Sequence, residues 1–245
     1  MAASLTAAKQ QLRSLMKQRL SGVPQDSVLA QSRKIFESLK DFAPYQDAAR
    51  ISIYLSMPAA EVQTDALVRH ALDAGKQVFV PYLHRSPLET SSTPARLMDM
   101  VLLKSIQDYE GLKLDRWGIP SIDPATVHDR QRILGGPDVH GSDMSTLDLM
   151  LMPGVAFDFD ETGSVRRLGH GKGFYDYFLT RYLARMDPSG GSLDRPPLRL
   201  YGLALTEQLL SASSGELVPA GSHDRSLHGL VLGSGEIIEA SSGSM

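Results

Sequence analysis

Apolar positions near the start of the chain recur with the period of an α-helix. At about 100° per residue, this spacing predicts a helix over residues 6–20. A second apolar face predicts another helix over residues 27–40, with Asp26 as its N-cap. The first apolar face is formed by Leu5, Leu12, Met16 and Leu20.

Two basic residues interrupt that first apolar face. Lys9 falls in the middle of the apolar arc and Arg13 at its edge, one turn later. A charge on a buried face costs free energy unless it is paired. Both side chains are therefore expected to meet an acid or an anionic ligand. The alternative is that they extend past the apolar face to reach water.

Short β-rich runs alternate with helical segments through the rest of the chain. Residues 50–56 and 77–82 are predicted strands, and between them Thr64 can cap a helix that Gly75 closes. This spacing predicts a parallel βαβ unit. Further strands are expected at residues 97–103, 147–152, 198–205 and 230–232, with a helix at 174–186.

The alternation of elements predicts an α/β fold, in a single three-layer αβα domain with a largely parallel central sheet and Rossmann-like layering. The domain is expected to span residues 1–235, with surface insertions near 84–95 and 187–197, a loop at 121–145 and a disordered tail at 236–245. Ligands in such sheets bind beyond the carboxyl ends of the strands. Glu61 and a glycine-rich segment both follow predicted strands.

That segment reads Gly169-His170-Gly171-Lys172-Gly173 and precedes the helix at 174–186. Glycines allow positive φ and leave backbone N–H groups open to an anion, and a helix N-terminus adds positive potential. Lys172 and the upstream Arg167 add full charges, so the segment suits a polyphosphate. It matches neither the GxxxxGK[ST] nor the GxGxxG pattern, and a plain tight turn is the alternative.

Composition narrows the choice of partners. With 245 residues and a formal net charge of -3, the chain offers no electrostatic case for nucleic acid or an anionic membrane. Zero cysteines exclude disulfides, thiolate chemistry and cysteine zinc sites. No acid precedes Asp26, which hints at a mitochondrial presequence, but the segment is interpreted as part of the fold.

Taken in order, these motifs resemble those of the 5-formyltetrahydrofolate cyclo-ligase family, over roughly residues 5–232. The pieces are Lys9 and Arg13, the ISIYLSM run from Ile51, Glu61 with Thr64, Gly75-Lys76, Met98 to Met100, the WGIP run from Trp117, MPGVAFD from Met152, RLGHGKGFYD from Arg167, and His223-Asp224. The long RLGHGKGFYD piece is the most specific.

The resemblance implies ATP-driven closure of 5-formyltetrahydrofolate to 5,10-methenyltetrahydrofolate, with release of ADP and phosphate and with Mg²⁺. It implies phosphorylation of the formyl oxygen before N10 attacks the activated carbon. Phosphoryl transfer depends mainly on positioning and on charge neutralisation, which the basic residues could supply.

The resemblance also implies roles for single residues. Those expected at ATP are Lys9, Arg13, Arg167, Gly169, His170, Gly171, Lys172, Gly173, Phe174 and Tyr175, of which Arg167, Lys172 and Tyr175 are expected to act in catalysis. Those expected at the folate are Leu55, Met57, Glu61, Trp117, Gly171, Lys172 and Tyr175, with Glu61 on the pterin ring. Asp176 and Asp224 are the expected Mg²⁺ ligands.

Other interpretations stay open for several of these residues. Glu61 could be a surface carboxylate, Trp117 and Tyr175 plain packing, and Asp224 a turn residue. His170 departs from the Tyr or Arg that is frequent in the family, and Phe174 from its usual Tyr. The alternative functions are a non-catalytic relative that binds folate or nucleotide, and an ATP-dependent enzyme with another substrate. On family grounds a cytoplasmic monomer is expected, with a mitochondrial pool left open.

Overall fold

The computed structural model describes residues 2–86, 94–135, 146–186, 197–211, 215–222 and 224–241. Its helices are α1 (Ala2–Ser21), α2 (Gln25–Lys40), α3 (Ala43–Asp47), α4 (Asp65–Asp73), α5 (Ile106–Glu110) and α6 (Phe174–Met186), with 3₁₀ turns η1 (Pro124–Asp129) and η2 (Thr206–Gln208). The main strands are β1 (Arg50–Ile53), β2 (Gln77–Arg85), β3 (Arg96–Leu102), β6 (Leu149–Met152), β9 (Arg199–Ala204), β10 (Gly229–Leu232) and β11 (Ile237–Glu239).

These seven strands form one sheet in the order β11-β10-β9-β6-β1-β2-β3. The central pairs are parallel: Ile51 of β1 lies opposite Val78 of β2 and Leu149 of β6. The edge strands β3 and β11 run antiparallel to their neighbours. The predicted βαβ unit and the largely parallel sheet are therefore confirmed.

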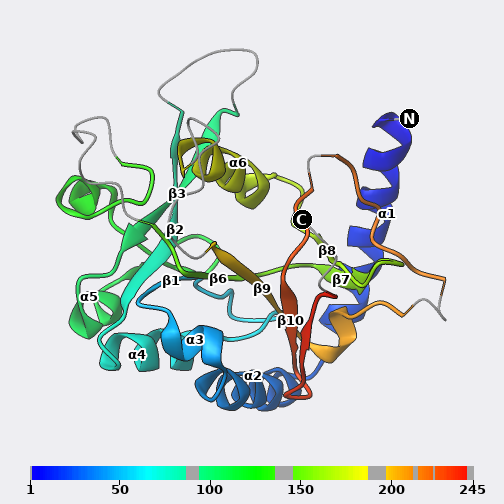
Figure 1. Ribbon diagram of the computed structural model, residues 1–245, viewed down its shortest axis with the longest axis horizontal. Coiled ribbons are helices and arrows are strands. Elements are labelled where there is room, and N and C mark those ends of the chain that lie inside the picture. Colours follow the sequence, from blue (N-terminus) through cyan, green and yellow to red (C-terminus); the bar gives the residue numbers. More distant parts are fainter. Residues whose placement is uncertain are drawn as a thin grey trace.

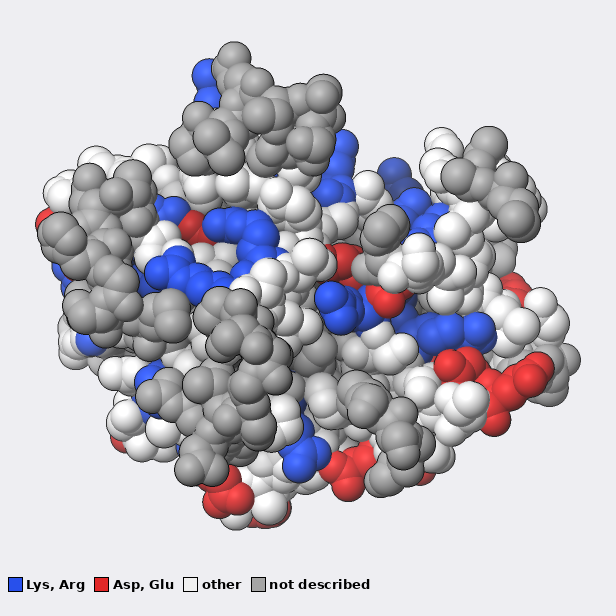
Figure 2. All heavy atoms as spheres, turned by 45° about the horizontal axis from the view of Figure 1, so that its top comes forward, with Lys and Arg blue, Asp and Glu red and all other residues white. Residues whose placement is uncertain are grey.

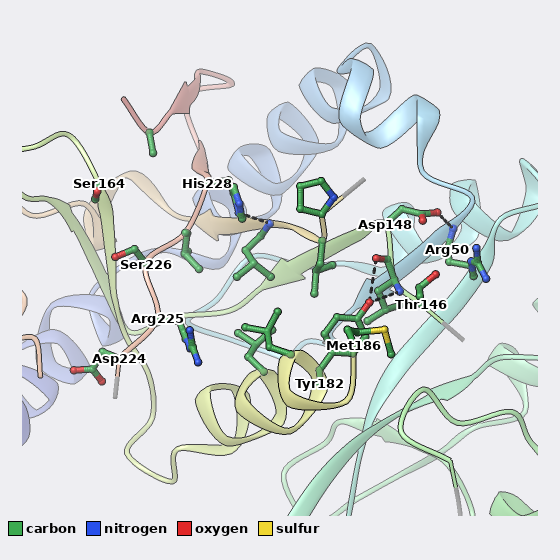
Figure 3. A pocket seen from close by; sticks show the side chains of 18 of the residues that line it. Arg50, Thr146, Asp148, Ser164, Tyr182, Met186, Asp224, Arg225, Ser226 and His228 are labelled. Atoms are coloured by element: carbon green, nitrogen blue, oxygen red, sulfur yellow. Dashed lines mark hydrogen bonds between the residues drawn. The ribbon is translucent and has the colours of Figure 1, made fainter. Parts of the chain in front are cut away.

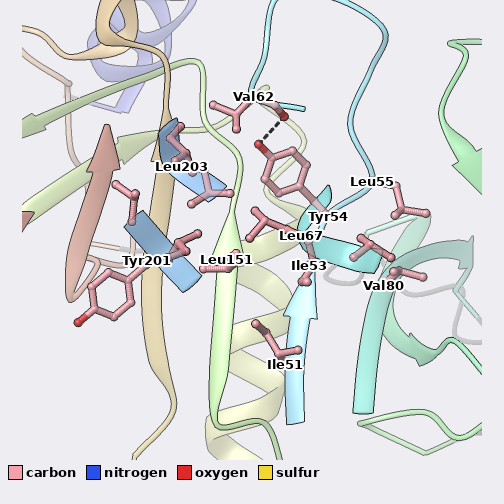
Figure 4. Packing of buried hydrophobic residues seen from close by; sticks show 14 of the residues in the cluster. Ile51, Ile53, Tyr54, Leu55, Val62, Leu67, Val80, Leu151, Tyr201 and Leu203 are labelled. Atoms are coloured by element: carbon pink, nitrogen blue, oxygen red, sulfur yellow. Dashed lines mark hydrogen bonds between the residues drawn. The ribbon is translucent and has the colours of Figure 1, made fainter. Parts of the chain in front are cut away.

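Helices cover both faces of the sheet (Figure 1), with α2, α3 and α4 on one side and α6 on the other. Figure 4 shows why the layers hold together, because Ile51, Ile53 and Leu151 project from adjacent strands into one buried cluster. Each of these side chains has an exposed fraction of 0%. The three-layer α/β class expected from the sequence is the observed one.

A separate two-stranded hairpin positions the glycine loop. Its strands are β7 (Ala156–Phe159) and β8 (Val165–Leu168), and Asp160 holds the turn by accepting hydrogen bonds from the backbone of Thr162 and Ser164. Val155 N donates to Leu168 O at 2.7 Å, which anchors the end of β8 beside the end of β6. A second ribbon joins β4 (Lys113–Leu114) to β5 (Pro120–Ser121).

Several local expectations were wrong. Pro24, not Asp26, is the N-cap of α2, and Asp26 lies in its first turn. Thr64 does precede α4, but its hydroxyl donates to Tyr54 O at 2.7 Å and caps no helix N–H. The expected disordered tail includes β11, which Gly235 turns back onto β10 with a φ of 94°. Of the two expected insertions, residues 87–93 and 187–196 lie outside the described residues.

No helix in the described ranges is long and apolar enough to cross a membrane.

Candidate active site

The glycine loop (residues 169–173) joins the end of β8 to the first turn of α6. Gly171 and Gly173 have φ values of 93° and 65°, in the left-handed region that side chains with a Cβ rarely adopt. Their conformation explains why glycine occupies both positions. The backbone N–H groups of the loop and the N-terminus of α6 together provide the anion-favouring end expected from the sequence.

Helix α1 lies along this loop, brings Arg13 to it and pairs Lys9 with Asp224. Arg13 Nε donates to Gly169 O at 2.8 Å, and Lys9 Nζ donates to Asp224 Oδ1 and Oδ2 at 2.7 and 2.5 Å. Arg13 packs so tightly that a Cβ on Gly171 would lie 3.1 Å from its Cζ. The expectation that Lys9 and Arg13 meet partners is confirmed, and the alternative that they simply reach water is wrong.

Arg167 is buried and ties three parts of the site together. Its Nη1 donates to Pro153 O at 3.2 Å, at the end of β6, and its Nη2 donates to Asp176 Oδ2 at 3.1 Å. The guanidinium lies 5.3 Å from the ring centroid of Tyr175. Arg167 thus fixes the start of α6 against the central sheet while carrying a full charge.

Lys172 and His170 behave differently from these anchored residues. Both side chains are exposed, and Lys172 has no hydrogen-bond partner in the part of the chain that the structure describes. The surrounding protein, followed by the charges of Arg167 and Arg13, lowers the pKa of His170. Lys172 is therefore the cation in this loop that is free to meet an incoming anion.

The two expected metal ligands lie on neighbouring elements. Asp176 Oδ1 accepts from the backbone N of Arg225 at 3.3 Å, and Asp224 Oδ2 accepts from Gly221 N at 2.6 Å. Asp224 therefore holds a turn and also forms an ion pair. A small hollow between these elements is lined by Arg166, Arg167, Val218, Ala220, Asp224, Arg225 and Ser226.

Two carboxylates fit Mg²⁺, which binds proteins through one or two such groups and takes phosphate and water as further ligands. No cluster of three or more His, Asp or Glu occurs among the described residues. Lys9 and Arg167 occupy the two carboxylates in this structure. A metal would thus have to displace Lys9 and Arg167 from the two carboxylates or share the carboxylates with them.

Glu61 is buried, with an exposed fraction of 6%, so the surface interpretation is wrong. Its Oε1 accepts a short hydrogen bond from Met57 N across a turn in which Ala60 has a φ of 65°. Burial raises the pKa of Glu61 to about 7, although the bond from Met57 works in the opposite direction. The carboxyl therefore changes charge near neutral pH.

Tyr54 and Tyr175 connect Glu61 to the glycine loop. Burial is the main cause that raises the pKa of each hydroxyl, and the charge of Glu61 adds to it in both cases. Tyr54 also feels Tyr175, and its hydroxyl donates to Val62 O at 3.0 Å. The expected folate and ATP sides are therefore close enough to influence each other electrostatically.

Trp117 is 51% exposed, so the interpretation as a core residue is wrong. Arg116 lies 4.0 Å over its ring, and the next residue, Gly118, packs so that a Cβ would lie 2.8 Å from Pro58 Cγ. This contact places the Trp117 loop beside the turn that carries Met57 and Glu61. The partly buried Met57 joins it there, whereas Leu55 is 8% exposed and belongs mostly to the core.

A cavity of about 870 Å³ lies among the described residues at the other end of the sheet (Figure 3). It is formed at the amino-terminal ends of β1, β6 and β9 and under α6, as Arg50, Asp148 and Tyr182 show. Among the expected site residues that the structure describes, only Asp224 lines it. Lys9, Arg13, Arg167, Lys172 and Glu61 do not line this cavity.

Three residues that help to form the site were missed from the sequence. Gln208 is buried and donates from Nε2 to Gly154 O at 2.6 Å, which supports the turn after β6. Tyr54 continues an apolar strand and gives no sign of its neighbours, and Arg225 contributes a backbone N–H that any residue could supply. No local sequence signal distinguishes these contacts.

Positive charge dominates the assembled site. Lys9, Arg13, Arg167 and Lys172 supply four cations, and Asp176 and Asp224 two carboxylates, so the net charge is about +2 before the partial charge of Glu61 is added. Figure 2 shows basic side chains beside acidic ones in the hollowed parts of the visible face. The arrangement suits a polyphosphate next to a heterocycle that can pair with a carboxyl group.

Comparison with known proteins finds relatives that cover most of the chain. The 5-formyltetrahydrofolate cyclo-ligase of Saccharomyces cerevisiae is 30% identical over 238 residues, covering 94% of this chain and 98% of the yeast protein. The Mus musculus protein of the same name is 33% identical over 180 residues, covering 74% of this chain and 77% of its own. The NMR structure of Aquifex aeolicus 5,10-methenyltetrahydrofolate synthetase shares the fold, with a TM-score of 0.60, 20% identity, and coverage of 97% and 95%.

The model of the 5-formyltetrahydrofolate cyclo-ligase family matches residues 5–233, which is almost the whole chain. The matched range includes both Lys9 and Asp224. The chain belongs to the 5-formyltetrahydrofolate cyclo-ligase family.

Proposed function

We propose that the protein is a ligase that converts 5-formyltetrahydrofolate to 5,10-methenyltetrahydrofolate, with ATP as co-substrate and with Mg²⁺. The observation that carries this proposal is the meeting of Arg13 and Arg167 at the glycine loop, with Lys9 held by Asp224. The charge of the buried Glu61 acts on Tyr175, in the first turn of the helix that follows the loop. The reaction needs cations that bind the phosphates of ATP and a carboxyl group that pairs with the heterocycle of the folate.

The chemistry follows from the poor leaving ability of a formamide oxygen. The formyl oxygen attacks the γ-phosphorus of ATP, the bond from that phosphorus to the bridging oxygen breaks, and ADP leaves. The N10 amine then attacks the activated carbon, phosphate departs with its oxygen, and N10 loses its proton. The five-membered ring closes with one ADP and one phosphate released for each product.

The cations have distinct parts in this proposal. Lys9 and Arg13 hold the phosphates from the side of α1. The loop from Gly169 to Gly173 contributes its N–H groups, with His170 within the loop and Phe174 directly after it. Lys172 lies exposed at the loop and meets the transferring phosphoryl group. Such groups stabilise the developing charge most when they are already in place.

The folate side is assigned to the other half. Glu61 pairs with the pterin ring, with Met57, Trp117 and Tyr175 around it and Leu55 behind them. Mg²⁺, when bound, would neutralise phosphate charge, and Asp176 and Asp224 are the residues that would hold it. The expected cytoplasmic location and monomeric state stay predictions.

The test is the absorbance of methenyltetrahydrofolate with purified protein, 5-formyltetrahydrofolate, ATP and Mg²⁺. We expect its band to grow only when ATP and Mg²⁺ are both present. Folate binding without growth of the band would instead support a non-catalytic relative. If the protein neither binds folate nor produces the band, only the proposed ATP site would stand.

A further inference from the structure

Side chains hold the turn that carries Glu61 in place. The turn comprises residues 56–63 and lies between the end of β1 and the start of α4. The structure describes all of these residues, and no backbone–backbone hydrogen bond joins them to one another. Buried backbone N–H and C=O groups cost free energy when they have no partner, so side chains have to supply the hydrogen bonds of this turn.

Gln63 supplies two of these hydrogen bonds from one amide group. Its Nε2 donates to Met57 O and to Glu61 O, both at 2.9 Å. The Glu61 carboxyl group accepts from the N–H of the same Met57, so Gln63 and Glu61 together bind both polar groups of the Met57 backbone. The Gln63 amide thus links two residues that the proposed function places on the folate side.

Gln63 is itself fixed from two directions. Its backbone N donates at 2.9 Å to Ser32 Oγ of α2, a residue that is 7% exposed. The next residue, Thr64, is 1% exposed, and its hydroxyl donates to Tyr54 O at 2.7 Å. Because Ser32 and Thr64 are both buried, Gln63 cannot move away from the turn without leaving buried polar groups without partners.

The turn needs such a restraint because it contains a strained residue. Ala60 has a φ of 65°, in the left-handed region, which costs free energy for a residue with a Cβ. A strained conformation of this kind persists only where the surrounding structure holds it. Gln63 binds the carbonyl groups of Met57 and Glu61, which lie on either side of Ala60 in the chain. Its amide therefore opposes a relaxation of the turn that would expose the Glu61 carboxyl group to water.

Tyr54 holds a different part of the turn. Its hydroxyl donates to Val62 O at 3.0 Å, and Figure 4 shows its ring within the apolar cluster beside β1. This hydrogen bond involves neither Met57 nor Glu61. Gln63, which has no part in the proposed reaction so far, is the neighbour that joins these two residues.

We propose that Gln63 is a positioning residue that keeps the Glu61 carboxyl group buried and directed toward the folate. The part that concerns the folate rests on the proposed function, whereas the part that concerns the burial of Glu61 stands without it. A glutamine amide suits this role because it has two N–H donors for two carbonyl groups. Methionine has a similar length but no N–H donor, and an ionised glutamate keeps the shape but can only accept.

The first measurement follows the burial of Glu61 through urea denaturation at pH 5 to 8. In the wild type, a folded-state pKa of about 7 makes the free energy of unfolding fall as pH rises toward 7. Gln63→Met should reduce that slope to about half or less, because Glu61 gains access to water and its pKa moves toward the ordinary value. Tyr54 and Tyr175, which are coupled to Glu61, keep their protons in this range because burial raises their pKa values.

The second measurement compares the affinities for 5-formyltetrahydrofolate and for ATP by calorimetry. Gln63→Met should weaken folate binding about tenfold and change ATP binding by less than about twofold. Gln63→Glu should weaken folate binding in the same way, and it carries the test if Gln63→Met does not fold. Gln46→Met is the control, because Gln46 is an exposed residue of α3 whose Nε2 donates to Lys40 O at 3.1 Å. It should change neither the slope nor either affinity.

The results separate this inference from the proposed function. An unchanged pH slope in Gln63→Met, or an equal loss of affinity for folate and for ATP, overturns the role assigned to Gln63. A reduced slope with unchanged folate affinity upholds the burial of Glu61 by Gln63 and contradicts the placement of Glu61 at the folate. If the wild type binds no folate, the proposed function fails, and the pH slope alone decides the role of Gln63.

Discussion

Lys9 and Asp224 form an ion pair across 215 residues of sequence, with Lys9 Nζ donating to both carboxylate oxygens. The lysine is expected to bind phosphate and the carboxylate to bind Mg²⁺. The ion pair between them uses the same groups that these ligands would need. Both side chains are partly buried, at 18% and 29% exposure. On the proposed function, binding of a nucleotide with its metal would exchange this ion pair for contacts to phosphate and to Mg²⁺.

The ion pair predicts that removing Lys9 changes the affinities for ATP and for Mg²⁺ in opposite directions. Lys9→Ala should weaken ATP binding about tenfold, because a charge-assisted contact is lost. The same change should strengthen binding of Mg²⁺ alone, because Asp224 is no longer neutralised. Calorimetry measures both affinities, and Lys17→Ala, an exposed lysine on the same helix, is the control. Equal behaviour of the two variants would rule out this exchange.

Lys172 is expected to act on the reaction and not on the fold. Lys172→Ala should reduce kcat/KM by roughly a hundredfold or more, because the transferring phosphoryl group loses a charge partner. The side chain is exposed and has no partner among the described residues, so the free energy of unfolding should change by no more than about 0.5 kcal/mol. Near wild-type kinetics would remove Lys172 from the chemistry.

Gly171 is expected to affect nucleotide binding through its close contact with Arg13, and not only through its positive φ. Gly171→Ala places a Cβ 3.1 Å from Arg13 Cζ and should displace that guanidinium from Gly169 O. We expect the KM for ATP to rise severalfold. Gly75→Ala is the control, because Gly75 has a φ of 73° with nothing near its Cβ position.

Both variants share a backbone strain of about 1 kcal/mol, measurable by urea denaturation. An equal rise in KM for the two would show that strain, and not the contact with Arg13, controls nucleotide binding.

Glu61 should make stability depend on pH. Its pKa is raised from 4.5 to about 7 in the folded protein, so between these values the folded chain keeps a proton that the unfolded chain releases. The free energy of unfolding should therefore fall as pH rises from about 4.5 to 7, by roughly 3 kcal/mol, and level off above. Glu61→Gln should remove this slope in urea denaturation curves at pH 5 to 8. Parallel pH profiles for the two proteins would show that Glu61 does not titrate in this range.

Glu61→Gln also tests the assignment to the pterin ring. Affinity for the folate should fall while affinity for ATP changes little, because the proposed function assigns the carboxyl to the folate half of the site. A similar loss for both ligands would point to a structural role through the turn at Met57.

The sequence predicted most of the helices and the parallel strands because each buries a continuous apolar face. It also showed that Lys9 and Arg13 needed partners, from their place on the apolar face of α1. It could not show which partners, since Asp224 lies near the far end of the chain and Gly169 accepts through its backbone. Contacts of this kind depend on the fold and leave no local pattern.

Other parts of the structure were missed for physical reasons that differ. The β7–β8 hairpin turns through Asp160, whose side chain replaces the usual two-residue turn signal. Strand β11 is only three residues long and depends on pairing with β10. Glu61 is buried at a turn in which Ala60 has a φ of 65°, a conformation that an alanine does not suggest.

The most direct test of the account quantifies methenyltetrahydrofolate and phosphate in the same reaction of the purified protein with 5-formyltetrahydrofolate, ATP and Mg²⁺. The account predicts equal amounts of the two products at every time point, and neither product when ATP is omitted. Phosphate without methenyltetrahydrofolate, or methenyltetrahydrofolate without phosphate, would contradict it.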